Sequence, residues 1–257
     1  MKDPYVYEGT NILKNLANIK DNHLLSQMEA DYTGSRLSDL AVMKSESLFD
    51  YDYICSIHHY IFQDVYGWAG NIRTINIEKS EPALGGLSIE YSDKSVLKDD
   101  INIVLNEMKK NKWKNSSVEE VTHDFSIYLA KLWKIHMFRE GNTRTIILFC
   151  THFIEAQGWY VDSDLFRMHA SYMRTALVAA NATFHDIGDK RNMEYLEKII
   201  FEALNNGLEM KERIIDKLNC IDTEVNEKIV REIVYWDRKE GKEHSCAEMK
   251  KYLMVKD

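Results

Sequence analysis

The side chains best suited to chemistry lie in one short stretch, Leu132 to Ile147, which reads LWKIHMFREGNTRTII. Its single histidine, His136, carries an imidazole, the side chain whose unperturbed pKa best suits proton removal near neutral pH. Apolar residues precede His136 at helical spacing, and a short polar run follows it. The pattern predicts a helix that ends near His136, which would place a candidate catalytic base at the entrance of a loop.

The loop after His136 has the features of an anion-binding site. It contains Gly141 and opens onto a second apolar helix, for which Asn142 is the predicted N-cap and Gly158 the predicted terminator. Backbone N–H groups at a helix start lack partners within the helix and lie at the positive end of its dipole, so they bind anions such as phosphate. Because that dipole disfavours a cation in the first turn, Arg144 is expected to serve a bound anion.

Glu140 lies beside this predicted anion site, where phosphate would repel a carboxylate unless a cation lay between them. Mg²⁺ typically takes one or two carboxylates together with phosphate oxygens and water, so we expect Glu140 to bind Mg²⁺. Taken singly, these residues have simpler explanations as a polar helix end, a solvated charge, a cap and a surface cation: His136, Glu140, Asn142 and Arg144. The functional interpretation rests on finding all four within nine residues.

The elements that must position these residues are mostly helices. Proline occurs only at Pro4 and Pro82, and apolar residues recur at three-to-four spacing in several segments, including 121–133. Residues 72–78 depart from this rhythm, since they alternate, are rich in β-branched side chains and are followed by Pro82 and a glycine pair. We therefore predict an all-α fold with one short β-hairpin over residues 72–89. This hairpin fits a plain surface hairpin as well as a functional flap.

The stretch from His136 resembles the motif of the Fic family, His-x-Phe-x-(Asp/Glu)-Gly-Asn-Gly-Arg-x-x-Arg. The residues that match in register are His136, Phe138, Glu140, Gly141, Asn142 and Arg144. The likeness extends to residues 61–74, which read IFQDVYGWAGNIRT and are similar to the family's lead-in to its flap. Residues 1–207 are accordingly identified as a Fic domain, and residues 208–257, with two amphipathic segments, as a C-terminal helical extension.

This resemblance implies a protein adenylyltransferase that binds ATP with Mg²⁺ and transfers AMP to a Ser, Thr or Tyr hydroxyl of a target protein or of itself. His136 would deprotonate the hydroxyl, and Glu140 would hold the metal. The implied nucleotide-binding residues, with Phe138 also anchoring the loop in the core, are Phe138, Arg139, Gly141, Asn142, Thr143 and Arg144. The implied flap, which would bind the target segment by strand addition, comprises Thr74, Ile75, Asn76 and Ile77.

Three positions depart from the family motif. Met137 stands where many members have proline, Thr143 replaces a glycine that could narrow the approach to the phosphates, and Ile147 replaces the second arginine. In the family, that arginine contacts the γ-phosphate and pairs with an inhibitory glutamate from a Ser/Thr-x-x-x-Glu-(Gly/Asn) helix. Since Ile147 can form a hydrogen bond with neither, we predict weaker orientation of a triphosphate and weak or absent inhibition of that kind. Glu227 matches the inhibitory motif only imperfectly.

Two alternatives to AMP transfer remain open. The same scaffold with a different donor would transfer a phosphoryl group, UMP or phosphocholine, and the loss at residue 147 makes such donors more plausible than an intact motif would. Alternatively, the chain is a nucleotide-binding regulatory module with weakened catalysis. The sequence does not identify the target protein, the role of residues 208–257 or the oligomeric state, for which a homo-oligomer stays open.

The composition is typical of a globular protein and lacks the general features of a protein that binds nucleic acid or spans a membrane. Lys and Arg number 33 against 41 Asp and Glu, and this net charge of −8 argues against a nucleic-acid footprint. No stretch approaches the ~18 apolar residues of a membrane span, so we expect a cytoplasmic protein. The four cysteines are far apart, and His58, His59 and His152 lack a convincing set of metal ligands, so we expect reduced thiols and structural histidines.

Overall fold

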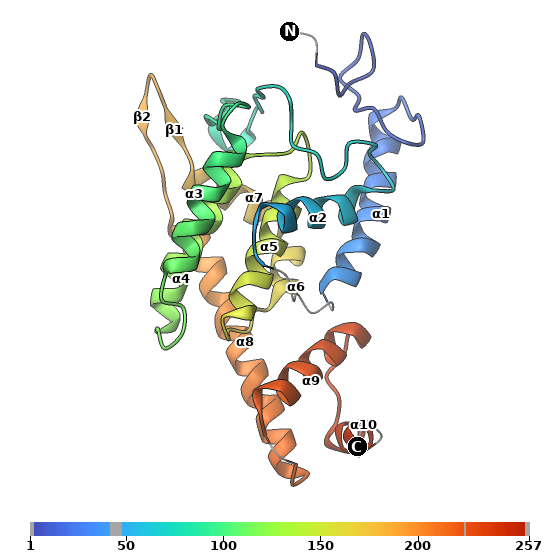
Figure 1. Cartoon of the computed structure of the whole chain (residues 1–257), viewed down its shortest axis with the longest axis vertical. Helices are drawn as coiled ribbons and strands as arrows, with labels where there is room; N and C mark the ends of the chain where they lie inside the picture. Colours follow the sequence, from blue (N-terminus) through green and yellow to red (C-terminus); the bar gives the residue numbers. More distant parts are fainter. Residues whose placement is uncertain (1–2, 42–47, 224, 255–257) are drawn as a thin grey trace.

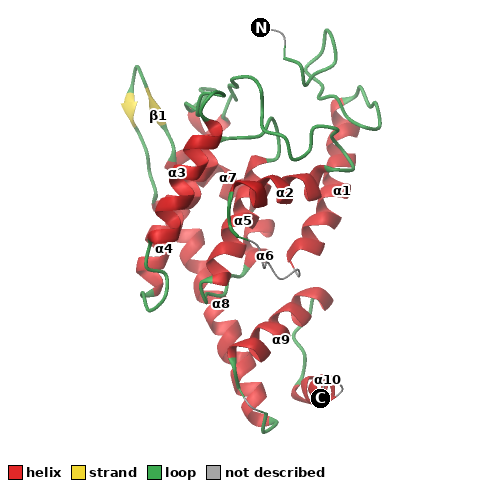
Figure 2. Ribbon diagram, in the orientation of Figure 1, coloured by secondary structure: helices red, strands yellow, loops and turns green. Residues whose placement is uncertain are grey.

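The computed structural model describes residues 3–41, 48–223 and 225–254 (Figure 1). Helices dominate these residues, which confirms the predicted fold class (Figure 2). In chain order the elements are α1 (Asn22–Ala41), α2 (Tyr51–Phe62), η1 (Pro82–Leu84), α3 (Leu97–Lys110), α4 (Val118–Ile135), α5 (Asn142–Ala156), α6 (Ser163–Met168), α7 (Ala170–Ala180), β1 (Thr183–Phe184), β2 (Gly188–Asp189), α8 (Glu194–Cys220), α9 (Glu227–Glu240) and α10 (Cys246–Met254).

The centre of the fold is the pair α4 and α5. Helix α4 begins at a capping box, in which the Ser117 hydroxyl accepts from the Glu120 N–H and the Glu120 carboxylate accepts from the Ser117 N–H. Its apolar stripe packs against α3, α5 and α8, and α5 packs in turn against α2. Because α5 buries residues on nearly every side, the loop that joins α4 to α5 is held at both ends by core helices.

Helix α8 carries the chain from this bundle toward α9 and α10 at the lower end of Figure 1. A Cβ atom at Gly207 would lie 2.1 Å from the carbonyl oxygen of Tyr160, so glycine permits this close approach. Beyond Gly207 a second group of buried apolar side chains forms around Tyr160, consisting of Ile214, Leu218, Val230, Ile233, Val234 and Met249. The predicted boundary after residue 207 falls inside α8, and the division into two domains stays a prediction.

The β-hairpin lies elsewhere than predicted. Strands β1 and β2 pair Thr183 with Asp189 and Phe184 with Gly188, whereas residues 72–89 contain no strand and form an extended loop that includes η1. Their sequence alternates because alternate side chains of this loop are more and less buried. The loop turns back on itself around η1, where the Glu81 N–H donates to the Leu87 carbonyl, and it also packs against the α4–α5 loop, where the Arg73 N–H donates to the Met137 carbonyl at 2.9 Å.

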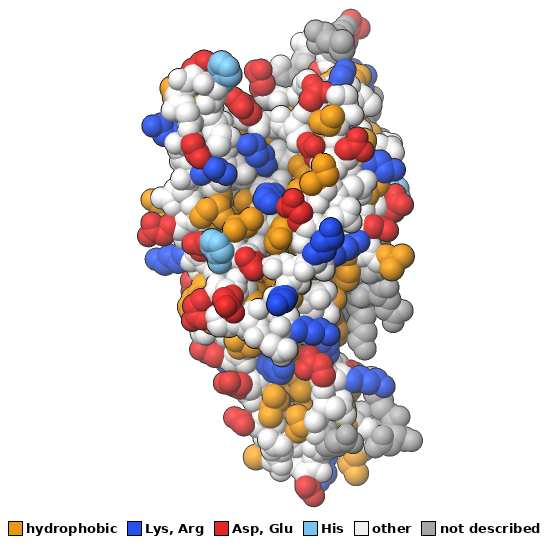
Figure 3. All heavy atoms as spheres, turned by 60° about the vertical axis from the view of Figure 1, so that its left-hand side comes forward, with side chains coloured by type: hydrophobic (Ala, Val, Ile, Leu, Met, Phe, Trp, Pro, Cys, Tyr) orange, Lys and Arg blue, Asp and Glu red, His pale blue; other side chains and the backbone are white. Residues whose placement is uncertain are grey.

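The surface carries mixed charge. On the face shown in Figure 3, Lys and Arg side chains alternate with Asp and Glu, and apolar side chains are exposed in small groups between them. The four cysteines, Cys55, Cys150, Cys220 and Cys246, are free thiols. Across the described ranges, no helix has both the length and the apolar character needed to cross a bilayer.

Candidate active site

His136 ends α4 and stands at the entrance of the loop. It is the C-cap residue and adopts a left-handed backbone conformation (φ 52°), with its N–H donating to the Trp133 carbonyl at 3.1 Å. This conformation is uncommon for a residue other than glycine, and it turns the chain sharply out of the helix. The turn directs the imidazole into the protein, where His136 is only 1% exposed.

The contacts of His136 determine its protonation state. Nδ1 lies 3.3 Å from the Trp133 carbonyl oxygen, which can only accept a hydrogen bond, so Nδ1 carries the proton. Burial lowers the pKa of His136 well below its usual 6.5, and the Lys79 ammonium nearby adds to that effect. The neutral ring therefore keeps a free lone pair on Nε2, which is buried and has no hydrogen-bond partner among the described residues. This is the state that a general base requires.

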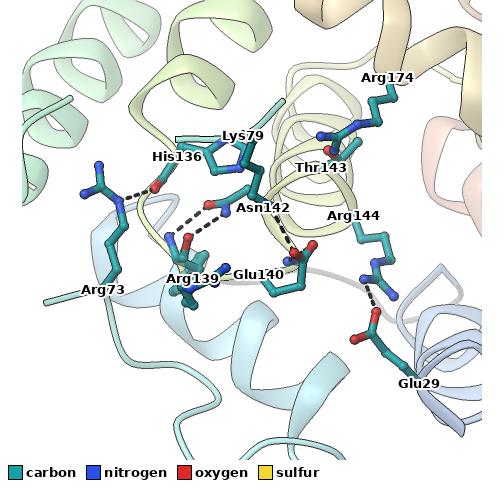
Figure 4. Close-up of polar contacts among 12 residues, drawn as sticks. Glu29, Arg73, Lys79, His136, Arg139, Glu140, Asn142, Thr143, Arg144 and Arg174 are labelled. Atoms are coloured by element: carbon teal, nitrogen blue, oxygen red, sulfur yellow. Dashed lines mark hydrogen bonds and ion pairs between the residues drawn. The ribbon is translucent and has the colours of Figure 1, made fainter. Parts of the chain in front are cut away.

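Asn142 closes the loop and is not the N-cap of α5 as predicted. The N-cap is Gly141, whose positive φ of 84° suits glycine, and Asn142 is the first helical residue. The Asn142 side chain accepts the Phe138 N–H at 2.9 Å and donates to the Phe138 carbonyl at 2.8 Å. These two hydrogen bonds connect the Asn142 side chain to the backbone of Phe138 across the loop. The Asn142 side-chain amide is therefore not available to cap α5 (Figure 4).

The stacked rings of Phe138 and His58 anchor the same loop in the core. Phe138 is fully buried, and its ring stacks on His58 of α2 with centroids 3.7 Å apart. His58 accepts the Gly70 N–H at Nδ1, so its Nε2 carries a proton and donates to the Glu140 carbonyl at 3.0 Å. Burial lowers the pKa of His58 to about 3, which keeps it neutral. His58, expected to be structural, thus supports the loop that carries Glu140.

Glu140 is ionised and has one strong cationic neighbour. Its Oε1 accepts the Gly141 N–H at 3.0 Å, and its Oε2 lies 2.9 Å from the Lys79 ammonium. Although burial acts in the opposite direction, the charge of Lys79 and these hydrogen bonds hold the pKa of Glu140 at about 2. No group of three or more metal-binding side chains occurs in the described chain. A single carboxylate beside a phosphate site suits Mg²⁺, which typically keeps water and phosphate oxygens as its other ligands.

Arg144 pairs with a residue that the sequence analysis missed. Its Nη2 lies 2.5 Å from Glu29 Oε1 and its Nη1 donates to the Thr33 hydroxyl at 3.0 Å, both on α1 (Figure 4). The other oxygen of Glu29 accepts a hydrogen bond from Tyr66. Ser26 precedes Glu29 by three residues, whereas Ser/Thr precedes Glu by four in the family's inhibitory motif. A search of the sequence for that motif therefore does not identify Glu29.

Glu227, the imperfect match to that motif, lies at the start of α9. Its carboxylate accepts from the Tyr160 hydroxyl at 2.9 Å and forms ion pairs with Lys211 and Arg231. These partners are residues of the C-terminal helices and of the segment that packs against them. The structure therefore places a glutamate next to a motif arginine at position 29 and not at position 227.

The two altered motif positions beyond the loop differ in environment. The Thr143 hydroxyl accepts the Trp133 indole N–H at 2.9 Å, which turns it toward α4. Ile147 lines a cavity of about 420 Å³ between α1, α5, α6 and α7, together with Arg144 and apolar side chains that include Leu37 and Met173. The space next to the missing arginine is thus mostly apolar.

Arg73 joins the 71–96 loop to His136. Although it is only 1% exposed, its guanidinium donates to the His136 carbonyl at 2.8 Å and to the carbonyls of Ile75 and Ser92. On the same loop, the Tyr91 ring lies 4.2 Å from the His136 ring, and Glu81 pairs with Arg174 of α7 at 2.7 Å. The contacts of Lys79 with Glu140 and of Glu81 with Arg174 had no recognisable signal in the sequence, because the partners lie far apart along the chain.

The predicted flap residues, Thr74 to Ile77, form the outer edge of this loop. The Thr74 N–H donates to the Tyr5 hydroxyl, but within the described part of the chain the backbone of residues 76–78 has no hydrogen-bond partner. A second cavity, of about 410 Å³, lies beside this edge and includes Arg139. The Arg139 guanidinium pairs there with Asp3 at 2.9 Å, so its side chain faces the predicted flap, and its contact with a nucleotide stays a prediction.

Comparisons with known proteins agree with this geometry. The model of the Fic/DOC family matches residues 48–154. A protein of Sinorhizobium fredii named "Probable protein adenylyltransferase y4lH" is 31% identical over 166 residues, which cover 64% of this chain and 81% of that protein. Protein adenylyltransferase VbhT of Bartonella schoenbuchensis is 28% identical over 63% of this chain, a match that spans only 33% of VbhT.

Solved structures show the same fold. The crystal structure of BepC from Bartonella tribocorum, which contains bound AMPPNP, superposes with a TM-score of 0.65 at 22% sequence identity. The superposition covers 77% of this chain and 95% of the BepC chain. The helical architecture, the loop between α4 and α5 and the relative that is matched over most of its length lead to one conclusion. This chain belongs to the Fic/DOC family.

Proposed function

We propose that this protein is an adenylyltransferase, which transfers AMP from ATP to a Ser, Thr or Tyr hydroxyl of a target protein. The observation that carries the proposal is the buried, neutral His136, whose Nε2 has its lone pair free at the edge of an anion-binding helix start. The names of the relatives y4lH and VbhT support the same activity.

The reaction follows from this state of His136. Nε2 takes the proton of the target hydroxyl, and the oxygen forms a bond to the α-phosphorus of ATP. The bond between the α-phosphorus and the bridging oxygen breaks, and pyrophosphate leaves with the electron pair. The imidazolium that forms is stabilised by the backbone carbonyl of Trp133, which accepts a hydrogen bond from Nδ1–H. It loses its extra proton to solvent after the product departs.

The phosphates would be held by the start of α5. The backbone N–H groups of Asn142, Thr143 and Arg144 have no acceptor in a preceding helical turn, and they lie at the positive end of the helix dipole. Arg144 would contact the β-phosphate once it leaves Glu29. Mg²⁺ bound to Glu140 would neutralise charge on the phosphates during transfer.

The target would bind along residues 74–77. The backbone of residues 76–78, at one end of this edge, has no hydrogen-bond partner in the described chain, so it can accept a strand from a target, and such pairing places little demand on side chains. The adjoining cavity contains Lys94 and Arg139 as well as Asp3 and Glu78, so it would receive side chains that flank the modified residue.

Labelled ATP tests the proposal directly. The purified chain is incubated with Mg²⁺ and either α-labelled or γ-labelled ATP, alone and in cell extract, and modified proteins are identified by mass spectrometry. AMP transfer predicts retention of the α label only, with a gain of one AMP on a hydroxyl residue. Retention of the γ label would indicate phosphorylation instead. ATP binding by calorimetry without any modified product would indicate the regulatory module.

A further inference from the structure

Lys79 forms an ion pair with Glu140, the carboxylate that would bind the metal. Its ammonium lies 2.9 Å from Glu140 Oε2, and the two side chains are only 16% and 30% exposed. The second oxygen, Oε1, accepts the Gly141 N–H, so Oε2, which faces Lys79, is the oxygen more open to a second cation (Figure 4). An ammonium group and a divalent cation on the same carboxylate oxygen repel each other, so the binding of one weakens the binding of the other.

The backbone around Lys79 is held in place independently of this ion pair. On one side Arg73 donates to the His136 carbonyl at 2.8 Å, and on the other Glu81 pairs with Arg174 at 2.7 Å. The Lys79 N–H itself donates to the Ser88 hydroxyl. Releasing the ammonium from Glu140 therefore requires the rotation of one long side chain, without movement of the loop.

We propose that Lys79 is the resident counter-ion of Glu140, and that Mg²⁺ displaces its ammonium group from Oε2 when it binds. Lys79 thereby sets the metal affinity of the active site. The inference rests on the proposed function, which places Mg²⁺ at Glu140. In the metal-free protein Lys79 also gives the half-buried carboxylate of Glu140 an ion-pair partner.

Manganese binding tests the exchange without relying on turnover. Mn²⁺ is titrated into the protein without nucleotide, and the free ion is followed by electron paramagnetic resonance. Lys79→Met removes the competing charge, so the apparent Kd for Mn²⁺ is expected to fall about five-fold, as for a site freed from a modest ion pair. Lys79→Arg restores a competing cation and is expected to bind Mn²⁺ like the wild type.

Two further variants separate this inference from the proposed metal site. Lys109→Met removes an exposed ammonium at the end of α3 and is expected to leave the Kd unchanged, whereas Glu140→Gln is expected to abolish binding. If Lys79→Met binds Mn²⁺ no more tightly than the wild type while Glu140→Gln abolishes binding, the exchange is wrong and the metal site stands. If Glu140→Gln binds Mn²⁺ normally, the metal assignment itself is wrong. Thermal unfolding of each variant checks that the fold is retained.

Discussion

The loop from His136 to Asn142 and the neighbouring flap edge, residues 76–78, differ in whether their main-chain groups have hydrogen-bond partners. In the loop from His136 to Asn142, side chains of Asn142, His58 and Arg73 satisfy main-chain groups, and the free polar atom is His136 Nε2. In residues 76–78 the described chain offers the backbone no partner at all. The groups that react in the proposed mechanism are thus held in place by neighbouring side chains, whereas the backbone of the proposed target-binding edge is left unpaired in the described chain.

Removing the base should have the largest effect. His136→Ala is expected to lower the transfer rate by roughly 10²- to 10⁴-fold, the usual contribution of a positioned general base. The measurement is incorporation of α-labelled ATP into a target or into the chain itself. His123→Ala, an exposed histidine on the same helix, serves as the matched control. Undiminished labelling by the His136 variant would remove the basis for its role.

Gly141 tests whether the loop must be rigid. An added Cβ would lie 2.3 Å from the Phe62 ring at a φ of +84°, so Gly141→Ala is expected to lower the free energy of unfolding by about 2–4 kcal/mol. Gly188→Ala has a similar φ of +79° but open space around it, and should cost about 1–2 kcal/mol. Urea unfolding of both variants measures the difference. Equal losses would mean that packing against Phe62 is unimportant.

The flap edge should respond to loss of a backbone donor. Ile77→Pro removes an N–H that has no partner in the described chain, so stability and ATP binding should change little. Target modification is expected to fall about ten-fold or more, because strand addition depends on main-chain hydrogen bonds. Ile77→Val keeps the N–H and should behave like the wild type. Equal rates for the proline and valine variants would argue against strand addition.

Mild acid should weaken the rigid region. The pKa of His58 is lowered to about 3, and that of His136 is lowered well below 6.5, so below pH 6.5 the unfolded chain binds protons that the folded chain excludes. Stability is therefore present above pH 6.5 and falls as the pH drops, by up to about 1.4 kcal/mol per pH unit for each histidine. Urea unfolding between pH 7.5 and 5.5 measures the slope. A flat profile would show that the two rings are accessible to protons.

The smallest expected effect concerns Glu29. The Glu29 carboxylate forms an ion pair with the guanidinium of Arg144. Glu29→Gln removes that ion pair, so ATP binding by Arg144 should become about three-fold tighter, as expected for a modest ion pair. Calorimetry with ATP provides the measurement. Asp31→Asn, which alters an exposed carboxylate on the same helix, is the control. Unchanged affinity in the Glu29 variant would support the expectation of weak or absent inhibition.

Short-range physics made much of the site predictable. The end of α4 near His136 and the start of α5 at Gly141–Asn142 follow from apolar spacing and glycine, within one or two helical turns. The anchoring position of Phe138 came from the resemblance to the Fic motif. The error at residues 72–89 has the same origin. Alternation shows that a segment is extended and half-buried, but it does not show whether another strand lies beside it.

By itself, the sequence determined a helical protein of one family, a histidine at a loop entrance and a carboxylate just before a helix start. Only the tertiary structure decided that Lys79 faces Glu140, that Glu29 faces Arg144 and that Arg73 supports His136. The physical reason is distance along the chain. Helix ends and turns depend on neighbouring residues, whereas an ion pair between residues 61 or 115 positions apart leaves no pattern that local spacing can reveal.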